Sequence, residues 1–219
     1  MKKNLTVVID GPAGSGKSTV SKLLAKELGL TYIDTGAMYR AVALKAHELG
    51  IDPADDGGLA RICGEITLTF DGERLFMDRR DVSKAIRTPL MDRLSSAVSA
   101  RPPVRKAMIG LQRRTAQRGG IVMEGRDIGT VVLPDADLKF FLTADNKVRG
   151  ERRYRERIDK GERADLATVV TEIERRDRDD SERELSPLRP AEDAIIVDTT
   201  YLSLDEVVAR IRGELLKTG

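Results

Sequence analysis

The chain contains 219 residues, and its composition of 40% hydrophobic and 34% charged residues is that of a folded, soluble protein rather than a disordered one. Its 38 basic and 36 acidic residues leave a formal net charge of +2, which argues against a field strong enough to hold DNA or an anionic membrane. A single cysteine, Cys63, cannot form an internal disulfide, and no apolar run approaches the roughly 18 residues of a membrane span. We therefore expect a cytoplasmic protein with neither a nucleic-acid nor a membrane partner.

The N-terminal residues have the pattern of a strand, a glycine-rich loop and a helix. Residues 5–9 form a short apolar run with β-branched side chains, which is typical of a strand buried on both faces of a parallel sheet. Glycines in the loop that follows exclude regular structure there. Apolar residues then recur at helical spacing from Lys17 to Leu28, and Gly29 ends the helix.

Strands and helices continue to alternate along the chain, with one exception. Residues 66–77 place apolar side chains between threonines around an Asp71–Gly72 turn, which predicts an antiparallel hairpin inserted into the series. The other predicted elements are strands at 31–33, 121–123, 138–142 and 195–197, and helices at 37–49, 89–100, 102–118, 149–183 (charged, and interrupted near Gly161) and 204–216. The five buried strands predict an α/β fold with a doubly wound, five-stranded parallel sheet.

Residues 11–18 match the phosphate-binding loop in which a glycine is followed, after four residues, by Gly-Lys-Ser. Its glycines let backbone N–H groups point at phosphate oxygens, and the helix that begins near Lys17 adds the positive end of its dipole. Lys17 supplies a charge to the β- and γ-phosphates, and the Ser18 hydroxyl is a candidate Mg²⁺ ligand, with Asp34 acting through a water molecule. The residues expected to bind ATP here are Gly11, Pro12, Ala13, Gly14, Ser15, Gly16, Lys17, Ser18 and Thr19.

Other classes of protein share this loop. A GTPase reads guanine with Asn-Lys-x-Asp, but the nearest string ends in Arg149, which disfavours that class. A helicase or motor needs an acidic residue at the end of an apolar strand, and Glu124 has that place, so this class stays open. The single histidine, His47, lies late in a predicted helix, and we interpret it as a structural or surface residue rather than a general base.

Three polar clusters lie where ligands bind in a doubly wound sheet. Residues 34–40 follow the second strand and residues 125–130 follow the third, which places both at the carboxyl edge of the sheet. The third cluster is rich in arginine, but residues 149–189 hold 12 basic and 12 acidic residues, a balance that predicts helices laced by surface ion pairs. A minority of these arginines is expected to reach over bound phosphates.

Taken together, these motifs resemble the bacterial cytidylate kinases. The resemblance rests on residues 11–18, 34–40 and 125–132 and on Arg-Asp-x-x-Asp-x-x-Arg at 176–183, and it runs in order from about residue 5 to 212. It implies a monomeric kinase that transfers the γ-phosphoryl group of ATP to CMP and dCMP with Mg²⁺. The parts that it implies are a P-loop core at 1–38, 101–148 and 190–219, a part that binds the nucleoside monophosphate and contains the hairpin at 39–100, and a helical lid at 149–189.

The resemblance also implies roles for single residues. The residues that would hold the phosphate of the acceptor are Arg40, Arg126 and Arg183. Those that would face its cytosine are Ser96, Arg105 and Asp127, and those near its ribose are Thr35, Arg176 and Asp180. The lid residues that would reach the donor are Arg152 and Arg153. The residues that would be catalytic are Lys17, Arg126, Arg152 and Arg183, which would stabilise charge on the transferring group.

Asp127 has a chemical reason to face cytosine. The N4 amine of cytosine donates to a carboxylate, whereas uracil would place its O4 acceptor there. A site built for one pattern can reject the other by factors of roughly 10⁴–10⁵. From the residues alone, the alternative for Asp127 is a turn or helix-capping carboxylate. For the whole chain, the alternatives are another small P-loop kinase and a regulatory ATPase or GTPase switch.

Overall fold

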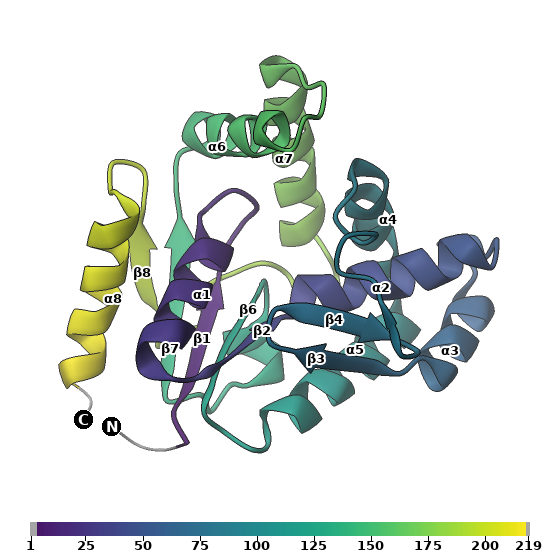
Figure 1. Cartoon of the computed structure of the whole chain (residues 1–219), viewed down its shortest axis with the longest axis horizontal. Helices are drawn as coiled ribbons and strands as arrows, with labels where there is room; N and C mark the ends of the chain where they lie inside the picture. The colour runs from purple at the N-terminus through teal and green to yellow at the C-terminus, as the bar shows by residue number, and fades with distance from the viewer. Residues whose placement is uncertain (1–3, 218–219) are drawn as a thin grey trace.

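The computed structural model describes residues 4–217, and its centre is a five-stranded parallel sheet with the strand order β2-β6-β1-β7-β8 (Figure 1). The strands are β1 (Thr6–Asp10), β2 (Thr31–Asp34), β6 (Ile121–Gly125), β7 (Leu138–Thr143) and β8 (Ile195–Asp198). β1 lies in the middle and pairs with β6 on one side and β7 on the other. The predicted fold class is therefore confirmed.

Helices cover both faces of this sheet because successive apolar side chains of a strand point to opposite sides. Val7 and Ile9 of β1 pack with α1 (Lys17–Leu28) and α8 (Leu204–Lys217). Val8 packs on the other face, toward α5 (Pro102–Ala116) and the short π-helix η1 (Ile128–Val132). The carboxyl ends of β1, β2 and β6 meet at one edge of the sheet, so the loops that follow these strands share one site.

The inserted hairpin is present, but it belongs to a larger unit than the sequence indicated. β3 (Leu68–Asp71) and β4 (Arg74–Met77) pair in antiparallel register, and the two-residue strand β5 (Arg80–Asp81) joins β4. Together with α2 (Thr35–Glu48), α3 (Asp56–Glu65) and α4 (Pro89–Ser99), this small sheet encloses a second hydrophobic core (Figure 1). The predictions did not include α3 or β5.

Two helices lie at the top of the view in Figure 1, beyond the carboxyl edge of the sheet. They are α6 (Asn146–Asp159) and α7 (Leu166–Ser181), and Gly161 lies in the break between them with a φ of 75°. This angle is in the left-handed region, where glycine has no steric penalty. The break between α6 and α7 confirms the interruption predicted near Gly161.

The other predictions concern single residues and termini. His47 is exposed on α2, as expected. Cys63 is half-buried against the second core, and burial raises the pKa of its thiol to about 11. Among the described residues, no helix has the length and apolar character needed to cross a membrane. Residues 1–3 and 218–219 of the predicted core lie outside the described residues.

Candidate functional site

The loop from Gly11 to Ser18 adopts a backbone path that needs glycine at fixed places. Gly11, Gly14 and Gly16 have φ angles of 151°, 75° and 88°. A Cβ atom on Gly11 would lie 2.1 Å from the Leu142 carbonyl oxygen, and one on Gly14 would lie 2.8 Å from the Arg149 carbonyl oxygen. The loop is therefore in close contact with β7 and with α6, which holds its backbone amides in place.

Lys17 is the first residue of α1, and its side chain is buried against this loop. Its Nζ donates to the Pro12 carbonyl oxygen at 3.0 Å. Burial and the charge of the nearby Arg126, partly offset by Glu124, together lower the pKa of Lys17 to about 7. An anion bound beside Lys17 would restore its charge, as a nucleotide phosphate does.

Ser18 is held by a buried carboxylate from the neighbouring strand. Its Oγ donates to Glu124 Oε2 at 2.8 Å, and the Tyr32 hydroxyl donates to Glu124 Oε1. Burial, reinforced by the charge of Asp34, raises the pKa of Glu124. Sequence reasoning connected Glu124 only with helicases and motors; the structure shows that it orients the hydroxyl proposed to bind a metal.

Asp34 contacts other groups than Ser18. Its Oδ1 accepts from the Ala37 backbone N–H at 2.9 Å, which caps α2, and its Oδ2 accepts from Arg87 at 2.5 Å. Burial raises the pKa of Asp34, but the charges of Arg87 and Arg40 outweigh that effect and hold it below its usual value. Asp34 therefore stays ionised at the rim of the site.

A cleft of about 640 Å³ lies between the phosphate-binding loop, the second core and the helices α6 and α7. On the donor side it is lined by the predicted residues Ala13, Gly14, Lys17, Ser18 and Thr19. On the acceptor side it is lined by all nine predicted residues, namely Thr35, Arg40, Ser96, Arg105, Arg126, Asp127, Arg176, Asp180 and Arg183. Segments that are far apart in the sequence thus form one continuous wall.

Arg126 and Arg183 converge on a single carboxylate. Arg126 Nε donates to Asp180 Oδ2 at 2.9 Å, and Arg183 Nη1 lies 3.6 Å from Asp180 Oδ1. Burial raises the pKa of Asp180, but Arg126 and Arg176 outweigh it, so the carboxylate stays charged. The carboxylate fixes the two guanidinium groups and leaves a positively charged wall suited to a phosphate.

Arg105 and Asp127 form a buried ion pair in the same cleft. Arg105 Nη1 also donates to the Ser99 carbonyl oxygen at 3.2 Å, and the guanidinium lies 5.7 Å from the centre of the Tyr39 ring. Asp127 precedes η1, but its side chain makes no capping hydrogen bond. The helix-capping alternative for Asp127 is therefore wrong, because its carboxylate pairs with Arg105 instead.

The comparisons with known proteins agree with this arrangement. A family model described as cytidylate kinase matches residues 7–216. The chain belongs to the cytidylate kinase family. The cytidylate kinase of Syntrophotalea carbinolica is 50% identical over 215 residues, covering 96% of this chain and 92% of that protein. The cytidylate kinase of Enterococcus faecalis is 48% identical over 219 residues, covering 98% and 97%.

Solved structures with little sequence similarity share the fold of this cytidylate kinase family member. A shikimate kinase from Bacteroides thetaiotaomicron has a TM-score of 0.51 at 14% identity, covering 97% of this chain and 98% of that one. An uncharacterized protein from Eubacterium ventriosum has a TM-score of 0.54 at 14% identity, covering 96% and 98%. At this level of identity, the likeness concerns the fold alone.

Within this family member, two neighbouring arginines of α6 point in different directions. Arg153 lines the cleft and pairs with Glu156 at 2.6 Å. Arg152 donates to the hydroxyl and the carbonyl oxygen of Thr199 at 2.9 and 2.7 Å, behind the phosphate-binding loop. Successive helical residues lie about 100° apart, so these two side chains cannot share a direction.

The remaining ribose candidates are held by specific contacts. The Thr35 hydroxyl donates to the Glu124 carbonyl oxygen at 2.7 Å. Burial lowers the pKa of Arg176 to about 10, together with the charges of Arg126 and Arg40. Among the described residues, the buried Nε of Arg176 has no hydrogen-bond partner.

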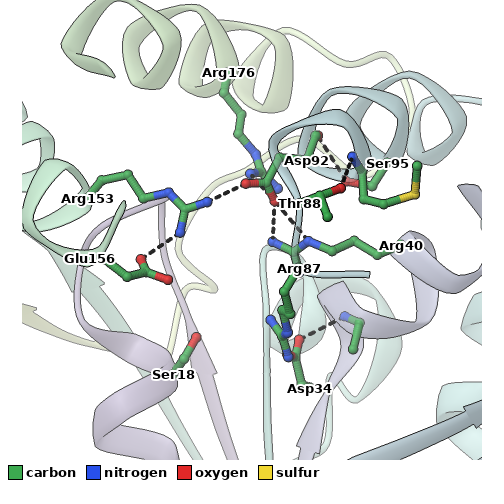
Figure 2. Close-up of polar contacts among 12 residues, drawn as sticks. Ser18, Asp34, Arg40, Arg87, Thr88, Asp92, Ser95, Arg153, Glu156 and Arg176 are labelled. Atoms are coloured by element: carbon green, nitrogen blue, oxygen red, sulfur yellow. Dashed lines mark hydrogen bonds and ion pairs between the residues drawn. The ribbon is translucent and has the colours of Figure 1, made fainter. Parts of the chain in front are cut away.

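Among the charged residues that sequence reasoning missed, two connect separate elements around the site. Arg87 pairs with Asp34, and Asp92 on α4 pairs with Arg40 and with the lid residue Arg153 (Figure 2). Neither residue lies in a motif, and their partners lie at least 50 positions away in the sequence. No local signal in the sequence identifies such contacts.

Proposed function

We propose that the protein transfers the γ-phosphoryl group of ATP to CMP, and also to dCMP, giving ADP and the nucleoside diphosphate. One observation carries this proposal: a single cleft joins the phosphate-binding loop to the buried Arg105–Asp127 pair. The loop offers a site for the triphosphate of the donor, and the ion pair offers hydrogen-bonding groups for a base. Membership of the cytidylate kinase family supports the same assignment.

The proposed chemistry needs positioning and charge stabilisation rather than a general base. The phosphate of a nucleoside monophosphate is already ionised at neutral pH, so one of its oxygens can attack the γ-phosphorus directly. Arg40, Arg126 and Arg183 would hold this attacking group, while Lys17 would bind the β- and γ-oxygens of the donor. The charge that develops on the transferring group would then lie among fixed cations.

We propose that Mg²⁺ accompanies ATP and that the Ser18 hydroxyl is its protein ligand. The Ser18 proton points to Glu124, which leaves the oxygen lone pairs available to a cation. Among residues 4–217, no group of three or more His, Cys, Asp or Glu side chains is placed to hold a metal, which suits an ion bound mainly by phosphates and water. When bound, the ion would neutralise charge on the phosphates, and Asp34 stays a candidate contact through water.

Base recognition is proposed for Asp127, Arg105 and Ser96. Asp127 would accept a hydrogen bond from the cytosine N4 amine, and the guanidinium of Arg105 would donate to N3 or O2. Uracil would place its O4 oxygen against the carboxylate and leave both groups poorly paired. Thr35, Arg176 and Asp180 would lie beside the ribose of the acceptor.

The lid is proposed to act on the donor through both of its neighbouring arginines. Arg153 lines the cleft and would reach the transferring phosphoryl group. Arg152 lies beside Thr199, whose hydroxyl is 3.2 Å from the Ser15 carbonyl oxygen, so Arg152 would contact the donor near the outer side of the loop. We further propose that the protein acts as a cytoplasmic monomer, with residues 149–189 as the moving part.

The proposal is tested by an ADP-release assay with Mg·ATP and a panel of CMP, dCMP, UMP, AMP and GMP. We expect strong stimulation by CMP and dCMP and far weaker stimulation by UMP. ADP release that is independent of any acceptor would indicate a regulatory ATPase. Equal rates with CMP and UMP would contradict the proposed role of Asp127.

A further inference from the structure

Asp92 lies on α4, and guanidinium groups from three other helices surround its carboxylate (Figure 2). Arg40 of α2 donates through Nε and Nη2, each 2.9 Å from Oδ1. Arg153 of α6 pairs with Oδ2, and Nη1 of Arg176 on α7 lies 3.9 Å from Oδ1. The Asp92 side chain is only 13% exposed, so these groups replace most of its water.

Proteins commonly bind a phosphate with several guanidinium groups, and the two carboxylate oxygens of Asp92 lie in an environment of this kind. Burial raises the pKa of Asp92, but Arg40, Arg153 and Arg176 outweigh that effect and hold it at about 2. The side chain is therefore an anion at neutral pH. Two of its partners, Arg40 and Arg176, are among the groups proposed to bind the acceptor nucleotide.

The same carboxylate connects the lid to α4. A second cavity, of about 660 Å³, lies between α4 and α7, and Asp92, Arg153 and Arg176 are among the residues that line it. The ion pairs of Asp92 connect α4 with Arg153 of α6 and with Arg176 of α7. A part-buried pair of this kind is screened less than a surface pair.

We propose that Asp92 pairs with Arg40, one of the groups proposed to hold the acceptor's phosphate, and with Arg153, and thereby latches the lid to α4 while the acceptor site is empty. The proposed competition between Asp92 and the acceptor nucleotide rests on the proposed function, because this competition requires Arg40 and Arg176 to bind the acceptor. An incoming phosphate dianion must share Arg40 with Asp92 and is repelled by its like charge, and the ribose must share Arg176. Asp92 is thus a positioning residue that weakens acceptor binding and keeps the empty lid closed.

The test replaces Asp92 by a neutral residue of the same shape, in Asp92→Asn. We expect the affinity for CMP, measured by calorimetry without ATP, to rise by roughly fivefold to tenfold, the scale of a coupling between two sites. In the absence of any nucleotide, we expect amide hydrogen exchange in α6 and α7 to become about tenfold faster, because local opening becomes easier. The matched control is Glu174→Gln, which removes an exposed carboxylate from α7 and should change neither measurement.

The combination of tighter binding and faster lid exchange cannot come from a damaged fold, which would weaken binding. Unchanged exchange in Asp92→Asn would overturn the latch, and unchanged or weaker CMP binding at an unchanged melting temperature would overturn the competition. If Asp92→Asn lowers the melting temperature, Asp92→Ser repeats both measurements with a smaller neutral side chain. Failure of the wild-type protein to bind CMP would instead contradict the proposed function, and the exchange measurement would still test the latch.

Discussion

Arg105 and Asp127 pair in the wall of the cleft with side-chain exposures of only 3% and 6%. The two residues come from α5 and from the turn after β6, so the pair joins α5 to the carboxyl end of β6. The desolvation of two buried charges offsets most of their attraction, so such a pair contributes little net stability. Its place in the cleft therefore favours a role in ligand recognition.

Replacing Asp127 by asparagine should reduce discrimination between bases. The amide keeps the shape of the carboxylate but removes its charge and one acceptor, so we expect kcat/KM for CMP to fall by about 10²-fold or more. Activity with UMP should fall far less. The measurement is ADP release with both acceptors, and Asp135→Asn, an exposed acid in the next loop, is the control. An unchanged ratio of CMP to UMP activity would rule out base reading by Asp127.

Removing Glu124 should weaken the use of metal. Glu124 holds the Ser18 hydroxyl at 2.8 Å, and partners that orient a metal ligand typically contribute about 10-fold to 100-fold in metal affinity. We expect Glu124→Gln to raise the Mg²⁺ concentration for half-maximal activity by at least about tenfold. Tyr32→Phe, which leaves the carboxylate in place, should have a smaller effect. A Mg²⁺ titration that is identical in wild type and Glu124→Gln would refute this role.

An added methyl group on Gly14 should disrupt the donor site. Its Cβ would lie 2.8 Å from the Arg149 carbonyl oxygen, and the φ of 75° is unfavourable for alanine. We expect Gly14→Ala to raise the KM for ATP about tenfold or more and to lower stability by about 1 to 3 kcal/mol. Gly213→Ala in α8, where no atom lies within 4 Å of the added Cβ, should be neutral or stabilise the protein by up to about 1 kcal/mol. Similar effects of both substitutions would contradict the steric argument.

Asp10 should make stability depend on pH. Its carboxylate accepts from the backbone N–H groups of Ile128 and Gly129 at 3.0 and 2.8 Å, and burial is the main cause that raises its pKa from 3.8 to about 7. Between these two values the folded protein holds a proton that the unfolded chain releases, so stability falls as pH rises through this window.

Asp10→Asn has no such proton. From pH 5 to pH 8, the wild-type protein should therefore lose about 2 to 3 kcal/mol of unfolding free energy relative to Asp10→Asn. Urea unfolding of both proteins at the two pH values measures this difference. Parallel pH profiles for the two proteins would show that the folded pKa of Asp10 is not raised.

Most of the central fold could be predicted because its signals are local. The apolar run of residues 6–10 and the glycines of the loop act through their own backbone and neighbours. The helix α3 escaped prediction because Gly57 and Gly58 lie in its first turn, where glycine weakens a helical pattern. β5 contains only Arg80 and Asp81, both exposed, so no apolar alternation marks it.

The site shows a similar division between local and distant signals. Residues in motifs, such as Lys17 and Asp127, line one cleft, and their roles in binding stay predictions. The choice between Arg152 and Arg153 depends on the rotation of α6 about its axis, which a highly charged helix does not reveal. Asp92 and Arg87 act through partners at least 50 residues away, and a single sequence carries no record of such contacts.

The central position of β1 affects how the protein is made. β1 ends at Asp10, yet its neighbours β6 and β7 begin only at Ile121 and Leu138. On the ribosome, this apolar strand therefore has no sheet partners until the strands β6 and β7 have also been synthesised. Its exposed edges then resemble those that chaperones bind, and the nucleotide loop can form only after the middle of the chain has emerged.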